Sequence, residues 1–521
     1  MRLARLTEAI GPRHTGVAGR GDIWQHQVCM PPFVRVVRLS IVGVWVALLV
    51  ALAAPHLPHR AAPGAPLAAP PGAADGAGED VWTGIYMKES KIGYSHYRAV
   101  PGPEGGVRIE ETSLLRLTVL DREQTVRATV TADAGGDYAM RQFDVALVTD
   151  LGTFAAHGLV ADGQLDLALQ TGGETSHQRV PLDAPLYLPS AARARLGASS
   201  LREGAELTVQ VFDVSALQHE PMTMRVLGRE EVIVDGAAVR SWKVRESFRG
   251  MESEVWLDDD GRTVRERGPM GLEVRRESAQ DAVATGWTGT PLDLMGAVAV
   301  PVADIDAPRE RPRLRLRLRG TEGLRIPSDG RQHVVGDELI VAREDAPAAT
   351  YRLPYADAEW QGELQPTLFL QSDHPRVRAA AQAAVGDERD PLAAAERLRQ
   401  WVHDELEKRP AATLPNALQV LETRAGDCNE HAVLFAALAR AVGLPTRVVA
   451  GLVYQDGSFL YHAWDEVWLG DAWLSVDTTF DQMPVDVTHI KLVVGGPETH
   501  AALVPLIGKV SIRVLPDGDA G

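Results

Sequence analysis

Apolar and polar residues alternate along much of the first half of the chain. Between about residues 81 and 277, runs such as 107–119 and 125–131 place apolar side chains at every second position, which indicates β-strands. Residues 253–257 and 262–266 flank the turn sequence Asp258-Asp259-Asp260-Gly261, a strong hairpin signal. Many strands joined by short turns predict an antiparallel sheet, sandwich or half-barrel over residues 80–285.

Two polar features, one in this region and one after it, each have a structural and a functional interpretation. Calcium ligation is the functional interpretation of Asp258 to Asp260, but the twelve-residue calcium-loop spacing is missing, so a polar turn is preferred. The run RPRLRLRLR at 311–319 predicts a strand with a leucine face and an arginine face. We expect the arginines to be solvated or locally paired, rather than to meet an acidic partner. With a second strand at 336–343, they define a small β module over residues 290–365.

The pattern becomes helical from residue 374. Asp390-Pro391 predicts a helix start, and a second helix is expected over 416–423. The apolar residues of the first helix recur at helical spacing, namely Leu392, Ala395, Leu398, Val402 and Leu406. A third, strongly apolar helix begins at Cys428 and ends before Gly443 and Pro445.

The chain returns to strands after Pro445. Residues 447–454 form one predicted strand, and 459–469 and 472–477 form a hairpin around Gly470-Asp471. A two-residue loop places Trp464 opposite Asp477. His462 then becomes a diagonal cross-strand neighbour of Asp477, so the spacing predicts a His–Asp pair on one face of the sheet.

Cys428 is predicted to lie in the first turn of its helix. The helix dipole and the unpaired N–H groups there favour a thiolate, which is the reactive form of cysteine, and can bind a developing oxyanion. Gly426 gives the backbone freedom to turn just before the helix. We expect the Asp427 carboxylate to point outward and to cap the helix.

These residue types suit acyl transfer. A carboxylate behind an imidazole fixes its tautomer, and the imidazole in turn activates a cysteine. Cys428 alone is more often a small buried hydrophobe and His462 a strand histidine, but their combination with Asp477 favours catalysis. His431, three residues after Cys428, is either a second base or, as we prefer, a structural or substrate-proximal residue.

The segments GDCNEHAVLFAALARAVGLPTRVVAGLVY and YHAWDEVWLGDAWLSVDTT resemble the bacterial branch of the transglutaminase-like superfamily. The shared pattern is Gly-x-Cys opening a helix, Gly-(Leu/Ile/Val)-Pro-x-Arg, His-Ala-Trp and Asp-x-Thr. The resemblance implies a papain-like α+β core over 370–515, with Cys428 as nucleophile, His462 as base and Asp477 as orienting acid. No cofactor is implied. Thr478 stands where the family usually has proline.

Other site residues are open. The candidates for a second oxyanion donor are Trp401, Asn416 and Gln419. Trp464, Trp468 and Trp473 either line a substrate groove or, for at least two of them, pack in the core.

The start of the chain reads as an export signal or a membrane anchor. Arg35 and Arg38 precede an apolar run at 39–54 within an N-terminal extension of residues 1–60, and a Pro/Ala-rich linker spans 61–79. The body is therefore expected outside the cytoplasm, in the periplasm or at the cell surface. A buried core helix is the weaker interpretation of this run.

Further details of the start stay open. Cleavage near Ala51-Leu52-Ala53 and retention as an anchor are equally compatible with the pattern, and Met1 and Met30 are both candidate starts. In an exported, oxidising setting Cys428 would be a thiol without an intramolecular partner, because Cys29 is the only other cysteine.

Composition narrows the classes of partner. The 521-residue chain has a net charge of −17, while its first sixty residues carry seven Lys/Arg against two Asp/Glu, so the body is close to −22. Such a body is a poor binder of nucleic acid. The sequence thus predicts thiol-dependent acyl transfer to an amine, or hydrolysis, at amide bonds of peptides or proteins. The alternative is a non-catalytic binding or assembly module, with a protein partner on the β-rich region.

Overall fold

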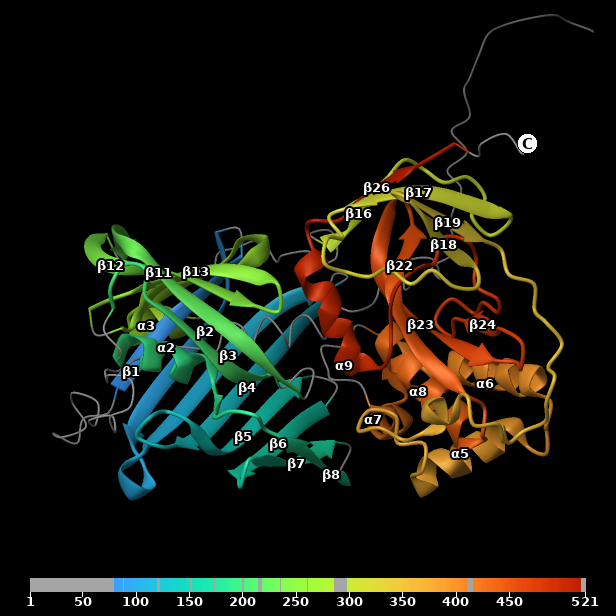
Figure 1. Cartoon of the computed structure of the whole chain (residues 1–521), viewed down its shortest axis with the longest axis horizontal. Helices are drawn as coiled ribbons and strands as arrows, with labels where there is room; N and C mark the ends of the chain where they lie inside the picture. The colour runs from blue at the N-terminus through green and yellow to red at the C-terminus, as the bar shows by residue number, and fades with distance from the viewer. Residues whose placement is uncertain are drawn as a thin grey trace, which may run out of the picture.

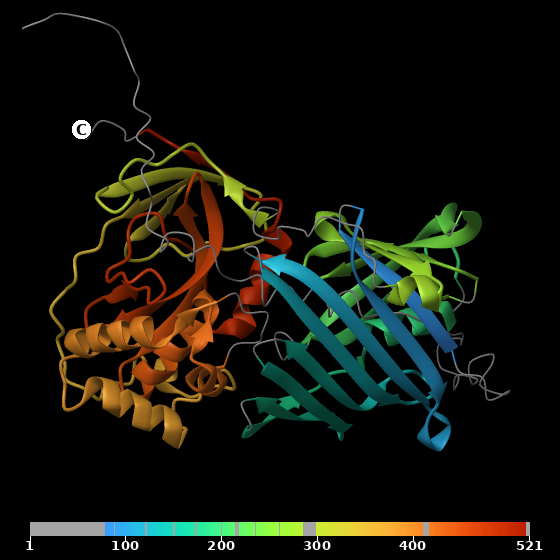
Figure 2. The ribbon, with the colours of Figure 1, turned by 180° about the vertical axis from the view of Figure 1, so that it is seen from behind.

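The computed structural model describes residues 79–87, 89–119, 122–149, 152–171, 174–198, 201–213, 218–234, 236–259, 261–284, 298–409 and 416–516. These residues form a mixed fold with a large β-sheet content and a few helices (Figure 1). One half holds a wide curved sheet, and the other holds helices packed against smaller sheets. Figure 2 shows the same two halves from behind.

The first half is a sheet of fifteen strands, called here the large sheet. Its strands pair in the order β8-β7-β6-β5-β4-β3-β2-β1-β15-β14-β13-β12-β11-β10-β9. They are β1 (Glu79–Met87), β2 (Ser90–Pro101), β3 (Val107–Val119), β4 (Arg122–Ala134), β5 (Met140–Thr149), β6 (Gly152–Ala161), β7 (Gln164–Thr171), β8 (Glu174–Pro181), β9 (Leu186–Tyr187), β10 (Glu206–Asp213), β11 (Gln218–Val234), β12 (Ala237–Phe248), β13 (Met251–Leu257), β14 (Thr263–Arg267) and β15 (Leu272–Glu277).

Pairing in the large sheet follows the alternation of the sequence. The strand predicted at 107–119 is β3, which pairs antiparallel with β4 from Val107 opposite Ala134 to Val119 opposite Arg122. Every neighbouring pair is antiparallel except β9 with β10. The polar turn after Leu257 joins β13 to β14, where Asp258 accepts a hydrogen bond from the Arg262 amide at 2.7 Å. Asp258 and Asp259 therefore belong to a hairpin turn, and Asp260 lies outside the described residues.

Two short helices accompany the large sheet. Helix α2 (Pro189–Ala198) buries its small residues in the core of the sheet, and α3 (Ala279–Val283) begins at the cap residue Ser278. Helix α2 also brings Arg193 into the interior. Its guanidinium contacts Glu246 at 2.6 Å and Glu266 at 2.9 Å, and all three side chains are buried.

The second half is built around the central sheet, in the order β16-β23-β22-β25 with β24 paired to β23. Its strands are β16 (Val300–Pro301), β22 (Thr446–Gln455), β23 (Ser458–Trp468), β24 (Trp473–Val476) and β25 (Ile490–Val494). The helices are α5 (Pro375–Val385), α6 (Pro391–Glu405), α7 (Ala417–Thr423) and α8 (Cys428–Ala441), with a two-strand pair of β20 (Glu407–Lys408) and β21 (Ala425–Gly426). Asp390 and Asn416 cap α6 and α7, as their positions in the sequence predict.

Helix α8 is the centre of this half. Twelve of its fourteen residues are buried, and it packs against β23 and β22 on one side and against α5, α6 and α7 on the others. The apolar sequence of the helix explains this placement, because a helix that is apolar all round needs neighbours all round. The first residue of α8 is thereby fixed at the edge of the central sheet.

The small sheet pairs in the order β18-β19-β17-β26, from β18 (Gln332–Val335), β19 (Glu338–Ala342), β17 (Arg313–Arg319) and β26 (Ser511–Val514). Leu314 and Leu316 of β17 are fully buried, as the alternation predicts. On the other face, Arg315 and Arg317 pair with Glu338 at 2.6 and 3.3 Å. The arginine face is locally paired.

The two halves meet through side chains and a short helix. Phe369 and Leu460 of the second half are buried in the apolar cluster of the large sheet. Helix α9 (Pro497–His500) lies between the halves in both views (Figures 1 and 2). The domain limits drawn from the sequence stay a prediction. Within the described residues no helix is long and apolar enough to cross a bilayer, and the apolar run at 39–54 lies outside them.

Glu111 of β3 generates a test of this buried core. Burial raises the pKa of its carboxyl to about 8, against the opposing charge of Arg193, so the group is neutral in the folded protein. The unfolded chain releases this proton near pH 4.5, so the group lowers the free energy of unfolding as pH rises from about 4.5 to 8. Glu111→Gln should remove that loss. At about 1.4 kcal/mol per pH unit, the variant should gain roughly 3 to 4 kcal/mol relative to the native chain between pH 5 and pH 8, in urea unfolding followed by tryptophan fluorescence.

Glu110→Gln is the matched control, because Glu110 neighbours Glu111 on the same strand and its side chain is only partly buried. A gain for Glu111→Gln that does not depend on pH, or one equal to that of the control, would contradict a buried neutral carboxyl.

Candidate functional site

Cys428 is the first residue of α8 and is fully buried. Asp427 caps the helix by accepting a hydrogen bond from the Asn429 amide at 2.9 Å, and the Glu430 carboxylate accepts one from the Asp427 amide at 2.9 Å. This capping box fixes the backbone around the thiol. The prediction of a cap is confirmed. The prediction that Asp427 points outward is wrong, because its carboxylate turns back to satisfy amides inside the protein and is 2% exposed.

Gly426 serves a different purpose from the one expected. Its φ lies outside the left-handed region, so backbone freedom is not what the position requires. A β-carbon at residue 426 would overlap the Glu430 side chain. Glycine therefore makes room for the carboxylate that completes the capping box.

The thiol lies against β23, a contact that the sequence did not reveal. The backbone N–H of Ala463 points at Cys428 Sγ over 3.1 Å. This N–H and the N-terminus of α8 both stabilise negative charge on sulfur. Because Ala463 follows His462, the contact places the cysteine beside the strand that carries the predicted base.

His462 and Asp477 are joined as the hairpin spacing predicts. The register of β23 with β24 pairs Asp465 with Val476, which extends to Trp464 opposite Asp477. His462 Nε2 lies 2.7 Å from Asp477 Oδ2, and both side chains are buried. A carboxylate only accepts hydrogen bonds, so Nε2 carries the proton. The structure thus joins His462 to Asp477 and places Cys428 against Ala463, the residue that follows His462.

The Asp477 carboxylate has a partner on each oxygen. Its Oδ1 accepts the amides of Thr479 at 2.7 Å and Phe480 at 2.9 Å. Burial by itself raises the pKa of Asp477, but His462 and His489 hold it well below its usual range. Burial lowers the pKa of His462, and the Asp477 carboxylate opposes this effect. The site therefore pairs an ionised acid with a histidine that favours its neutral form.

His489 is a member of the cluster that the sequence did not indicate. Its Nε2 lies 3.0 Å from the same Asp477 Oδ2, and its ring is fully buried. It comes at the end of an irregular segment between β24 and β25, where no periodicity relates it to His462 or Asp477. No signal in a single sequence would have found it.

Several neighbours hold this segment in place from the small sheet. Arg331 donates hydrogen bonds to the carbonyl oxygens of Asp486 and His489. The Gln332 amide bonds both the N–H and the C=O of Lys491, at 2.8 and 2.7 Å. The connection between β17 and β18, together with β18 itself, thus fixes the backbone on both sides of His489.

The cluster of His462, Asp477 and His489 has the residue types of a metal site but the spacing of hydrogen bonds. Among the described residues, His462, Asp477 and His489 place two imidazole nitrogens and a carboxylate oxygen within 4.8 Å of one another. A tetrahedral zinc ion bonded to an imidazole nitrogen and a carboxylate oxygen, each at about 2.0–2.1 Å, would hold these two atoms roughly 3.3 Å apart. The observed separations of 2.7 and 3.0 Å are those of hydrogen bonds, and we assign the group as a hydrogen-bond network.

The tryptophans divide between the site and a separate, half-buried cluster. The ring of Trp464 stacks on His462 with centroids 6.1 Å apart and meets His489 edge-on at 5.3 Å. Trp468 and Trp473 pack instead with Trp360. Trp464 is therefore the tryptophan that packs against the His462 imidazole.

The three candidate oxyanion donors and His431 make other contacts. Asn416 and Gln419 bond each other at the start of α7, and Trp401 lies under the Arg424 guanidinium. His431 directs Nδ1 to the Asp427 carbonyl oxygen at 2.7 Å, and burial lowers its pKa to about 4. A histidine with that pKa stays neutral, which fits the structural or substrate-proximal role.

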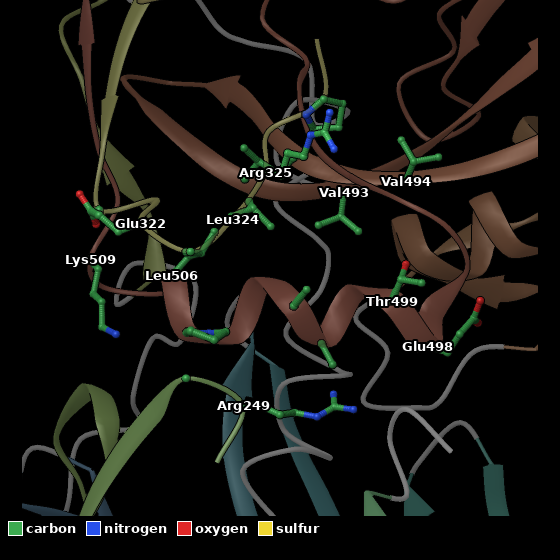
Figure 3. Close-up of a pocket in the computed structure, with 18 of the residues that line it drawn as sticks. Arg249, Glu322, Leu324, Arg325, Val493, Val494, Glu498, Thr499, Leu506 and Lys509 are labelled. Carbon is green, nitrogen blue, oxygen red and sulfur yellow. The ribbon is translucent and has the colours of Figure 1, made fainter. Parts of the chain in front are cut away.

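Two open clefts lie among the described residues, away from this cluster. One of about 870 Å³ runs along α9 and the residues after it, between Arg249 of the β12–β13 turn and Arg325 and Val493 of the second half (Figure 3). Another of about 550 Å³ lies between β8 and residues 366–373. Neither is lined by Cys428, His462 or Asp477. Cys428 is fully buried among the described residues.

Residues 378–478 match the family model of the transglutaminase-like superfamily. This part of the chain is a transglutaminase-like domain. The matched range begins in α5, includes Cys428 and His462, and ends one residue after Asp477, so it covers the network up to but not including His489. Such a domain is compatible with cysteine-based chemistry.

Known proteins resemble parts of this chain. A protein-glutamine gamma-glutamyltransferase of Pseudomonas aeruginosa is 32% identical over 162 residues, which cover 27% of this chain and 24% of that protein. An uncharacterised protein of Mycobacterium leprae is 28% identical over 166 residues, covering 30% of this chain and 57% of that protein. The chain thus spans about a quarter of the first and little more than half of the second.

Among solved structures, a putative cysteine protease from Cytophaga hutchinsonii shares 17% identity over 41% of this chain and 82% of its own, with a TM-score of 0.26. A likeness at this score carries no argument about the fold.

The capping box of the transglutaminase-like domain provides a test. Asp427→Ala removes the acceptor for the Asn429 amide and should lower the free energy of unfolding by about 1 kcal/mol. Asp427→Asn keeps an acceptor oxygen, so its free energy of unfolding should fall by less. Urea unfolding of both variants checks the order. Equal losses would show that the carboxylate charge, rather than the cap, stabilises this turn.

Proposed function

We propose that the chain is a thiol enzyme that forms an acyl-enzyme at Cys428 and passes the acyl group to an amine or to water. The observation that carries the proposal is the contact of Cys428 Sγ with the Ala463 N–H at 3.1 Å, next to a His462–Asp477 pair joined at 2.7 Å. The arrangement supports the three roles of nucleophile, base and orienting acid.

The reaction begins with proton transfer from the Cys428 thiol to His462. Nε2 of the ring is bonded to Asp477, so Nδ1 takes the proton. Sulfur attacks the carbonyl carbon of an amide, and the N–H groups at the start of α8 stabilise the oxyanion of the tetrahedral intermediate. His462 then protonates the leaving nitrogen, the C–N bond breaks and a thioester remains on Cys428.

Release of the acyl group repeats these steps with a new nucleophile. His462 removes a proton from an incoming amine or from water, the nucleophile attacks the thioester, and the thiol leaves with the proton returned to sulfur. An amine gives a new amide, and water gives an acid. The name of the Pseudomonas aeruginosa relative, a protein-glutamine gamma-glutamyltransferase, favours glutamine side chains as acyl donors and amines as acceptors.

The setting that we propose for this chemistry follows from the sequence. The charged flank and apolar run at 39–54 suit export or anchoring, and the acidic body suits peptide or protein substrates rather than nucleic acid. The large sheet would then hold a protein partner. A non-catalytic binding module is the competing interpretation, and the two experiments that follow separate them.

Acyl transfer is tested with the full chain and a panel of glutamine-containing peptides. Ammonia release reports both outcomes, and incorporation of a fluorescent primary amine reports transfer alone. Cys428→Ala should abolish both signals, and His462→Ala should reduce them by at least about 100-fold, since positioned acid–base catalysis contributes 10²–10⁴-fold. His333→Ala, an exposed histidine of the small sheet, is the control and should keep full activity. Turnover that survives in Cys428→Ala would refute the proposal.

The pH profile gives a second test. His462 acts as a base only when neutral, and burial lowers its pKa below 6.5, so the acid limb of kcat/KM should have its midpoint below pH 6.5. Alkylation of Cys428 by iodoacetamide, followed by mass spectrometry of its peptide, should be faster at pH 6 in the native chain than in His462→Ala. Slow alkylation with the same pH profile in both would indicate an inert thiol and favour the binding module.

A further inference from the structure

Asp477 Oδ2 is shared by two histidines, and the acyl-transfer mechanism uses one of them. His462 Nε2 approaches this oxygen at 2.7 Å and His489 Nε2 at 3.0 Å, and the two imidazole centroids are 5.6 Å apart. His489 is fully buried and follows a segment that Arg331 anchors through two carbonyl oxygens. A buried ring that is held so firmly against the orienting acid needs an explanation.

The second nitrogen of His489 faces another carboxylate. Nδ1 lies 3.4 Å from Asp486 Oδ1, within reach of ionic attraction, though without the alignment of a hydrogen bond. Asp486 is itself fixed by the Thr488 amide at 2.8 Å and the Thr488 hydroxyl at 2.6 Å. A neutral ring protonated at Nε2 would direct the Nδ1 lone pair at this carboxylate, whereas an imidazolium offers an N–H to each acid.

The charged groups around His489 come from every element that packs on it. They are Asp477 after β24, Asp486 in the following segment, His462 on β23, and Arg331, whose charge is opposed by Glu344 at 3.7 Å. Burial lowers the pKa of His489, but the hydrogen bond to Asp477 and the negative charges of Asp477 and Asp486 outweigh it and raise the pKa above 6.5. The surroundings thus favour the charged ring.

We propose that His489 is a positioning residue which, as an imidazolium held between Asp477 and Asp486, orients the Asp477 carboxylate and keeps His462 neutral in the resting enzyme. The proposal rests on the function assigned to Cys428 and His462 above. Its physical basis is charge sharing, because an Asp477 carboxylate facing His462 alone would stabilise a protonated His462. A second positive charge on the same oxygen offsets that stabilisation.

His489 therefore influences the reaction in two separable ways. Its N–H positions the acid, and its charge lowers the pKa of His462. His489→Gln places an amide N–H near Nε2 without the charge, so it tests the second effect alone. His489→Ala removes both. Asp486→Asn keeps His489 but withdraws one of the two carboxylates that stabilise its charge.

The first readout does not depend on turnover. Full-length protein labelled with ¹³C at the imidazole Cε1 is titrated by NMR, and signals are assigned by single histidine substitutions. His489 should stay protonated to above pH 6.5 in the native chain and lose its proton at lower pH in Asp486→Asn. His462 should titrate higher in His489→Gln than in the native chain, by on the order of one pH unit. His333→Gln, which alters an exposed histidine, is the control and should move neither.

The second readout is kcat/KM against pH. In His489→Gln the acid limb should move to higher pH by the same amount while the plateau stays within about threefold, and His489→Ala should also lower the plateau by at least about tenfold. A plateau loss in both variants with no movement of the limb, or a His462 titration that His489→Gln leaves unchanged, would overturn the proposal and leave His489 a packing residue.

Failure of the underlying function has a different signature. If Cys428→Ala keeps turnover or His462→Ala leaves alkylation unchanged, the acyl-transfer assignment falls, whatever the two histidines do in NMR. A coupled titration with no turnover on any peptide would preserve the His462–Asp477–His489 linkage and remove its catalytic meaning.

Discussion

The Asp477 carboxylate is the group around which this site is organised. It is fully buried, yet Oδ1 accepts two backbone amides and Oδ2 accepts two imidazoles, so the desolvation cost of a charge is offset by four hydrogen bonds. Each bond reaches a different kind of support. The amides define the turn after β24, His462 leads to the thiol, and His489 leads to the small sheet. Removing the carboxylate would leave all four donors unsatisfied in the interior.

Much of the thiol side of the site follows from local rules. The cap at Asp427, the helix after Cys428 and the hairpin around Gly470-Asp471 are short-range features, and the two-residue period of a strand fixes His462 against Asp477 once the turn length is known. The prediction for the Asp427 carboxylate was wrong because the sequence does not show that Asp427 and Glu430 cap each other in the interior, with Gly426 leaving room for the Glu430 side chain. The contact of Cys428 with Ala463 depends on tertiary packing of α8 on β23, which no spacing encodes.

The β-rich half shows the same division. Alternation identified strands such as β3, where one face is buried and the other is not. It did not choose between a sheet, a sandwich and a half-barrel, because that choice depends on which strands pair over long separations, such as β1 with β15. The sequence could not predict the neutral Glu111 or the ion cluster of Arg193 either, because both result from the packing of α2 on the large sheet. His489 belongs to this class too, because an irregular segment carries it to Asp477.

The small sheet has a consequence for the order in which the protein becomes competent. Its fourth strand, β26, lies beyond α8, the hairpin and α9 in the chain and pairs with β17, about two hundred residues earlier. The same sheet supplies Arg331 and Gln332, which grip the backbone on either side of His489. A nascent chain that has already made its cysteine, histidine and aspartate still lacks the last strand of the support that holds them. The backbone support of the site is therefore complete only once β26 has been made and has paired with β17.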